Sequence, residues 1–110
     1  MKIRRGNSRY SDVILTTDGE SVCQGSSKYG KVLFTIDGNT IRRGNSKYGD
    51  VVVTVNGDKV CQGNSKYGTV IATIDGESVH EGHSKYGTVI ATIEGGRMSG
   101  AAAAAFLLLS

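Results

Sequence analysis

The amino-acid sequence repeats itself every 19 residues. A tyrosine column, a serine column and two glycine columns keep this spacing: Tyr10, Tyr29, Tyr48, Tyr67 and Tyr86; Ser8, Ser27, Ser46, Ser65 and Ser84; Gly6, Gly25, Gly44, Gly63 and Gly82; Gly19, Gly38, Gly57, Gly76 and Gly95. A fixed period of this length is typical of repeat architectures, in which each unit buries its apolar side chains against its neighbours. We therefore predict one β-repeat domain of five units over residues 1–98, followed by a separate apolar capping or docking segment over residues 99–110.

Each unit is predicted to form a β-hairpin. In the fourth unit, residues 70–74 alternate in a β-branched pattern that is typical of a strand, and residues 78–81 form a shorter second strand. Asp75-Gly76 lies between them and favours a two-residue type I′ turn, which needs a positive φ at both central positions. This turn would place Ala72 opposite Val79 and Ile74 opposite Glu77.

The second connection in each unit also has the residues of a turn. Ser65-Lys66-Tyr67-Gly68 favours a type I turn followed by a left-handed residue. Five copies of the unit then give about ten short antiparallel strands, arranged as a meander sheet or a barrel.

Apolar residues recur on one face of the predicted strands. The second strands contribute Ile3, Val22, Ile41, Val60, Val79 and Met98. The opposite face is half apolar, so closure into a barrel, coiling into a solenoid or pairing with another copy would cover more of it than an open sheet. A β-solenoid is the alternative, with like residues stacked about 4.8 Å apart. The cation column, which contains Arg9 and Lys28, argues against it because adjacent like charges repel.

The last residues depart from the repeat. Ala101–Ala105 and Phe106, Leu107, Leu108 and Leu109 predict a short helix that is apolar on every side, with Ser99 as a possible N-cap. We expect this helix to plug or cap the sheet, or to dock into a neighbouring subunit through Phe106 to Leu109; contact with a lipid surface is an alternative. The nine apolar residues are too few to span a bilayer.

Composition adds weaker constraints. The net charge of +3 is short of the dense basic patches that make nucleic acid the default partner. Residues 1–5 lack the apolar region of a signal peptide, so we expect a cytoplasmic location. Cys23 and Cys61 lie two repeats apart, beyond the reach of a disulfide in either architecture, and we expect free thiols.

The turn residues supply the candidate interaction sites. Tyrosine and lysine alternate along one predicted edge: Lys28, Tyr29, Lys47, Tyr48, Lys66, Tyr67, Lys85 and Tyr86. Such an edge could stack sugars or bases and attract phosphate, although each ring could instead pack on the next repeat.

Other candidate groups have simpler structural explanations. The opposite edge carries Asp18, Asp37, Asn56, Asp75 and Glu94, which could bind Ca²⁺ but are also ordinary turn residues. The Arg4-Arg5 and Arg42-Arg43 pairs could form a guanidinium array, or could alternate with Cys-Gln only to limit repulsion. His80 and His83 form a single H-x-x-H with no third ligand column, which is a weak metal signal.

No unique catalytic constellation is present in a chain that offers each nucleophile several times. We therefore predict no catalytic residues, no metal site and no cofactor, and we do not expect an enzyme.

The unit Gly44 to Val60, G-N-S-K-Y-G-D-V-V-V-T-V-N-G-D-K-V, resembles repeats in small uncharacterised bacterial proteins. Those repeats share a GNSxYxxVxxTIDG-type pattern and a hydrophobic C-terminal segment. The resemblance covers nearly the whole chain and implies a bacterial or mobile-element origin and a tail that is native to the fold. It implies no activity or site.

These features predict a non-enzymatic structural repeat protein that self-associates into a homo-oligomer or filament. The two edges of the sheet differ in charge: one carries lysine-bearing turns and the other aspartate-bearing turns. The lysine edge of one copy could therefore attract the aspartate edge of the next copy, head to tail. The alternative is a binding module for a polyanion or glycan that uses the tyrosine and lysine residues at the turn tips.

Overall fold

The computed structural model describes residues 1–109, which form ten strands and one helix. The elements are β1 (Lys2–Arg5), β2 (Val13–Asp18), β3 (Ser21–Gln24), β4 (Val32–Asp37), β5 (Thr40–Arg43), β6 (Val51–Asn56), β7 (Lys59–Gln62), β8 (Val70–Asp75), β9 (Ser78–Glu81), β10 (Val89–Ile93) and α1 (Arg97–Leu109).

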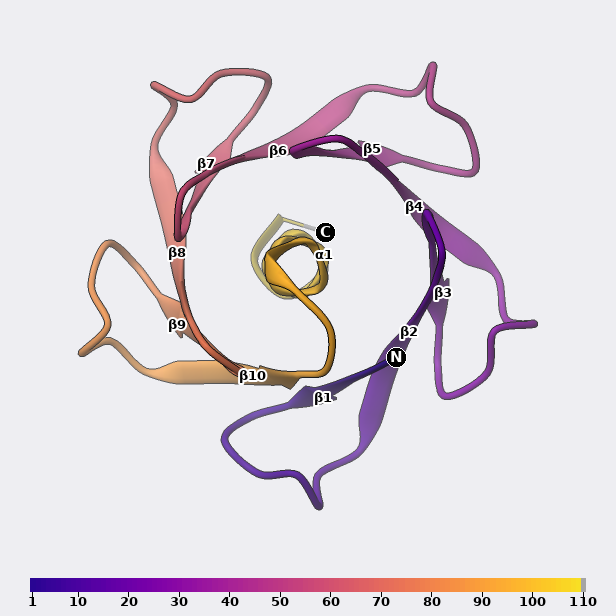
Figure 1. Cartoon of the computed structure of the whole chain (residues 1–110), viewed down its shortest axis with the longest axis horizontal. Helices are drawn as coiled ribbons and strands as arrows, with labels where there is room; N and C mark the ends of the chain where they lie inside the picture. Colours follow the sequence, from indigo (N-terminus) through magenta and orange to yellow (C-terminus); the bar gives the residue numbers. More distant parts are fainter. Residues whose placement is uncertain (110) are drawn as a thin grey trace.

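The ten strands close into an antiparallel barrel in which each strand pairs with its neighbours in sequence and β1 pairs with β10. Figure 1 shows the strands as a ring around α1, which is seen end-on at the centre. The predicted all-β hairpin architecture is therefore confirmed in its barrel form, and the solenoid is not formed. Closure leaves no unpaired edge in the sheet, because the first and last strands satisfy one another.

The seam of the barrel repeats the register of the hairpins. Ile3 pairs with Ile93 across the seam in the same relation as Val22 with Thr17 inside a hairpin. The backbone hydrogen bond from Gly6 to Ile90 (2.8 Å) likewise matches that from Gly25 to Ile14 (2.9 Å). Ile3 takes the place that the 19-residue column predicts for Met98. That prediction for Met98 is wrong, because the chain leaves the sheet after β10 and Met98 lies in α1.

The two-residue turns differ from the predicted type. Asp75 pairs with Ser78, so the central residues are Gly76 and Glu77 rather than Asp75 and Gly76. Gly76 has a φ of 60°, and no residue other than glycine has a positive φ within the described chain. A glycine at the first central position alone is the requirement of a type II′ turn, not of type I′.

The predicted register changes with the turn. Ile74 pairs with Val79 and Ala72 with Glu81, which corrects the predicted pairings of Ala72 with Val79 and Ile74 with Glu77. The predicted face of each strand is still right, because moving the turn by one residue shifts the pairing by two positions and side chains alternate with a period of two.

The helix fills the barrel. Ala101, Ala102, Ala103, Ala104 and Ala105 have no solvent exposure, and α1 contacts strands on several sides. Gly100 faces Ile74 so closely that a Cβ atom there would lie 2.9 Å from the Ile74 Cδ1 atom. Small residues are thus required where the helix passes the apolar columns of the strands, and the tail plugs the barrel of its own chain.

Ser99 is not the N-cap. α1 begins at Arg97, and the Ser99 amide already donates to the Gly96 carbonyl at 3.1 Å. The glycine pair after β10 permits this earlier start, because Gly95 turns the chain inward with a φ of 92°.

Candidate interaction surface at the petal tips

Five loops project outward from the barrel, and we call them petals. They are residues 6–12, 25–31, 44–50, 63–69 and 82–88, and each joins the two strands of one long hairpin. Figure 1 shows them radiating from the ring.

Each petal ends in a tight serine-initiated turn. In the petal 44–50, the Gly49 amide donates to the Ser46 carbonyl at 3.4 Å, and the Tyr48 amide donates to the Ser46 Oγ atom at 3.0 Å. The second bond occurs at 3.0 Å in all five petals, which explains the serine column. The serine side chain therefore holds the backbone that presents the tyrosine.

The predicted left-handed residue lies at a different glycine. Gly44, at the start of the petal, has a φ of 86°, whereas Gly49 is not among the glycines with positive φ. Gly49 is required for space, since a Cβ atom there would lie 2.2 Å from the Arg43 carbonyl oxygen.

Two side-chain columns fasten the petals to the outer face of the barrel. Thr54 Oγ1 donates to the Gly63 carbonyl at 2.8 Å, and the other four units repeat this bond at 2.7 to 2.9 Å. The petal itself thus helps to cover the outer face, where four of the five threonines are buried.

The second column contains arginine, cysteine or histidine. Arg42 Nη1 donates to the Gly49 carbonyl at 2.9 Å, Cys61 Sγ donates to the Lys66 carbonyl at 3.5 Å, and His80 Nδ1 lies 2.9 Å from the Gly87 carbonyl. Arg4 and Arg42 are therefore petal anchors rather than members of an open guanidinium array. Cys23 and Cys61 are buried free thiols beneath different petals.

The histidine pair does not converge on a common ligand position. His80 is buried under its petal, whereas His83 is exposed. Within residues 1–109, no group of three or more His, Cys, Asp or Glu side chains could hold a metal ion. The acidic turn residues lie at the hairpin turns, and Asp37 accepts a 3.0 Å hydrogen bond from Arg42.

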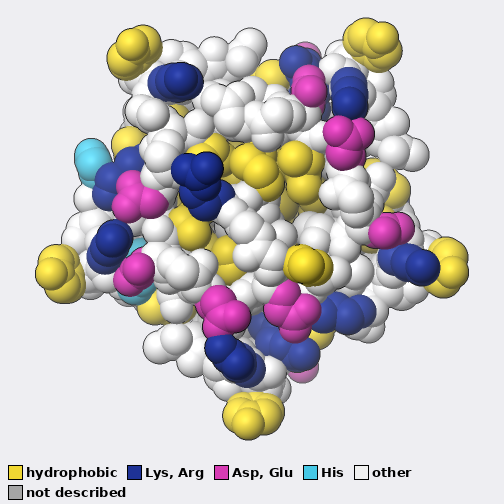
Figure 2. Space-filling model, viewed as in Figure 1, with side chains coloured by type: hydrophobic (Ala, Val, Ile, Leu, Met, Phe, Trp, Pro, Cys, Tyr) yellow, Lys and Arg dark blue, Asp and Glu magenta, His cyan; other side chains and the backbone are white. Residues whose placement is uncertain are grey.

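The tyrosine rings stand clear of the protein. Tyr10, Tyr29, Tyr48, Tyr67 and Tyr86 are 98%, 86%, 96%, 95% and 98% exposed. The alternative in which each ring packs on the next repeat is wrong, because such packing would bury the ring. Figure 2 shows hydrophobic side chains at the outermost points of the molecule, with basic side chains nearby. The Lys28 ammonium lies 5.5 Å from the centre of the Tyr29 ring, a cation–π distance.

Several petal cations reach acidic groups of the same chain. Lys47 Nζ lies 3.1 Å from Glu20, and Arg9 pairs with Glu77. Lys85 Nζ lies 4.0 Å from Asp75. All of these side chains are at least half exposed, and exposed pairs of this kind contribute little stability and open readily.

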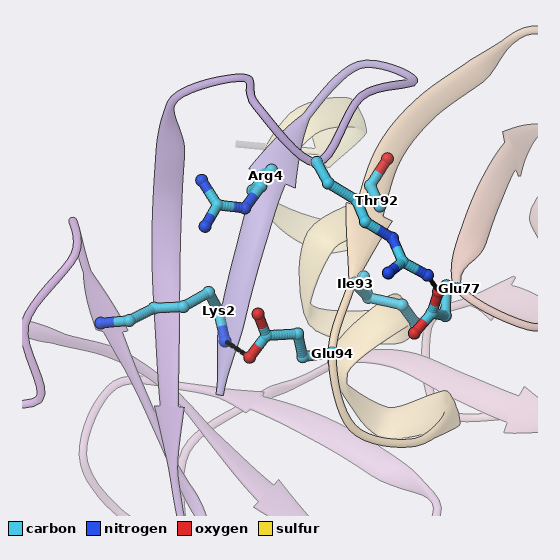
Figure 3. A pocket seen from close by; sticks show the side chains of 7 residues that line it. Lys2, Arg4, Glu77, Thr92, Ile93 and Glu94 are labelled. Carbon is cyan, nitrogen blue, oxygen red and sulfur yellow. Dashed lines mark hydrogen bonds and ion pairs between the residues drawn. The ribbon is translucent and has the colours of Figure 1, made fainter.

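Charged side chains of both signs also line a hollow at the barrel seam (Figure 3). The Lys2 amide donates to Glu94 Oε1 at 3.2 Å, and the Arg9–Glu77 pair closes the other side. Arg4 donates to the Ser11 carbonyl at 2.9 Å. Because these polar groups are hydrogen-bonded or paired within the chain, we interpret the hollow as part of the junction of β1 and β10.

Comparison with known families places the chain in a family whose description is sixfold, whereas the described residues form five petals. The family model described as "6-fold beta flower protein" matches residues 3–109. The chain belongs to this beta flower family. The described residues of this beta flower form five petals, with the plug helix included in the matched range. No curated protein and no solved structure matches the chain. Among the described residues, α1 is too short to be a candidate membrane span.

Proposed function

We propose that this beta flower is a non-enzymatic structural repeat protein whose five petals bind a flexible anionic polymer, such as an acidic glycan or a single-stranded nucleic acid. The exposure of all five tyrosine rings carries this proposal. An aromatic ring held away from the protein by a hydrogen-bonded turn gives no packing energy to the fold, but it provides a flat surface for sugars or bases.

The neighbouring cation supplies the second part of each tip. Every tyrosine follows a lysine or arginine directly in sequence, so each petal presents one ring and one positive charge. The ion pairs at Arg9, Lys47 and Lys85 are exposed, so a polymer phosphate, sulfate or carboxylate can replace the internal acid.

Because five petal tips are carried by one barrel, a ligand long enough to reach several tips should bind more tightly than a short one. A single ring and cation bind weakly, but a polymer that contacts one tip has a raised effective concentration at the next. A ligand too short to reach two tips loses this advantage. The proposal therefore requires affinity to grow with polymer length.

Self-association through opposite charges has less support. The petal cations and turn acids that were expected to attract head to tail meet within one molecule at Arg9, Lys47 and Lys85. Oligomer or filament formation therefore needs a different contact, and we place polymer binding ahead of it.

The test compares the wild-type chain with two variants altered at all five tyrosines. Binding of fluorescent heparin-like polysaccharide, single-stranded DNA and neutral dextran is measured by anisotropy at several salt concentrations. We expect the wild type to bind at least one anionic polymer in a salt-dependent manner. The five-Tyr→Phe variant should retain binding, and the five-Tyr→Ser variant should lose it by at least tenfold.

Equal melting temperatures for the three proteins provide the folding control, because the rings contribute nothing to the core. Absence of binding to both anionic polymers, or equal binding by the Tyr→Ser variant, would refute the proposal.

A further inference from the structure

Two neighbouring grooves near the C-terminal end of α1 are copies of one another, shifted by one repeat. The first, which we call the Phe106 groove, runs along residues 31–34 to Arg43 and Gly44 and is bounded by Phe106. The second, the Leu109 groove, runs along residues 50–52 to Gln62 and Gly63 and is bounded by Leu109. Equivalent backbone positions therefore allow a direct comparison of their side chains.

The two grooves differ in charge at equivalent positions. Lys31 and Arg43 flank the Phe106 groove, where the Leu109 groove has Asp50 and Gln62, with Arg43 at its border. The corresponding pairs in the other repeats are Asp12 with Gln24, Thr69 with Glu81, and Thr88 with Arg5. Of these five equivalent pairs, only the pair at the Phe106 groove consists of two cations. The side chains therefore differ between repeats here, although the backbone is repeated.

The cations of the Phe106 groove are available to a ligand. Both Lys31 and Arg43 are exposed, and neither takes part in an ion pair within residues 1–109. This differs from Arg42, which pairs with Asp37 and anchors a petal.

The walls of the same groove are apolar. Phe34 replaces the leucine, valine and alanine residues at the equivalent positions in the other repeats and is 2% exposed, while Leu33 and Phe106 are partly buried. Large apolar walls beneath two unpaired cations match a molecule with one apolar chain and one anionic end.

We propose that the Phe106 groove binds a monomeric fatty carboxylate, with the acyl chain on Val32, Leu33 and Phe106 and the carboxylate between Lys31 and Arg43. A guanidinium pairs with a carboxylate through two parallel hydrogen bonds, and the lysine adds a second positive charge. Each further methylene that reaches the groove should raise affinity about fourfold until the groove is full. The site is independent of the petal tips.

Calorimetric titration with decanoate below its micelle concentration tests this site. We expect saturable one-to-one binding to the wild type, at least tenfold weaker binding of decanol, and about 16-fold weaker binding of octanoate. The double variant K31D/R43Q copies the residues of the Leu109 groove and should bind decanoate at least tenfold more weakly. Arg5→Gln, which removes the cation at the position equivalent to Arg43 in another repeat, is the matched control and should bind normally.

A variant that gains a binding site shows that lost binding in K31D/R43Q is not caused by misfolding. The D50K/Q62R variant places two cations in the Leu109 groove and should bind a second decanoate. The five-Tyr→Ser variant should bind decanoate like the wild type, which separates this site from the polymer-binding proposal. Equal affinity of K31D/R43Q and wild type, equal binding of decanol, or binding to anionic vesicles without any binding of monomeric decanoate would overturn the inference.

Discussion

Gly49→Ala tests whether the petals depend on close backbone packing. The added Cβ would lie 2.2 Å from the Arg43 carbonyl oxygen, so the petal backbone must move. The first petal shows the size of such a movement, because it has Ser11 at the equivalent position. Its bond from the Arg5 amide to the Asp12 carbonyl is 3.2 Å, against 2.8 Å from Arg43 to Asp50, a lengthening of 0.4 Å.

The expected cost follows from two opposing effects. Overpacking typically costs about 1–3 kcal/mol. Replacing glycine by alanine restricts the unfolded chain and returns about 0.4–1 kcal/mol. The middle of these two ranges gives a net loss in the free energy of unfolding of about 1.3 kcal/mol for Gly49→Ala, which corresponds to a fall in Tm of roughly 5–10 °C for a domain near this size.

Urea unfolding followed by circular dichroism measures this difference, with the slope m held common to the variants. Gly96→Ala is the matched control, because a Cβ there has no neighbour within 4 Å and φ is not positive. Because Gly96 directly precedes α1, where glycine is a better cap than alanine, this substitution should lower stability only slightly and by less than Gly49→Ala. If Gly49→Ala were as stable as the wild type, or if Gly96→Ala lost as much, the proposed steric role would be refuted.

Three further predictions test the anchors, the plug and the charge pairing. Thr54→Val removes the hydrogen bond to the Gly63 carbonyl and should lower the free energy of unfolding by about 1 kcal/mol in the same assay; an unchanged value would contradict the anchoring role. Ala103→Leu enlarges a residue with no solvent exposure and should cost about 1–3 kcal/mol or more, whereas a neutral result would mean that the barrel interior has spare space. Sedimentation equilibrium should give a monomer of 11.6 kDa in both low and high salt, because petal cations meet turn acids within the chain; a salt-sensitive oligomer would restore head-to-tail assembly.

The repeat pattern predicts the all-β hairpin architecture but does not choose between a meander sheet and a closed barrel. Period-two alternation around Val70 to Ile74 identifies a strand, and the glycine columns identify its turns. The half-apolar second face argues against an open sheet but does not distinguish closure from coiling or from pairing with another copy. The sequence could not separate a turn centred on Asp75-Gly76 from one centred on Gly76-Glu77, because both place a glycine at positive φ and keep the same faces inward.

The other differences between the predictions and the structure depend on contacts between residues far apart in the sequence. Nothing local to Met98 indicates that Ile3 already occupies its strand position, since this follows only from closure after five units. The exposure of Tyr48 and the pairing of Lys47 with Glu20 likewise depend on the direction in which a petal leaves the barrel. The chemistry of the Phe106 groove does not follow from the repeated columns, because Lys31 and Arg43 depart from their columns and meet beside Phe106 only in the folded barrel.

The most direct measurement of the multivalent account is a graded series in which one to five petal tyrosines are changed to serine and polymer affinity is measured at constant salt. If the five tips act as equivalent contacts, affinity should fall by a similar factor with each ring removed, independently of which petals are altered, while Tm stays constant. An affinity that is lost with one particular tyrosine, or that survives the loss of all five, would contradict it.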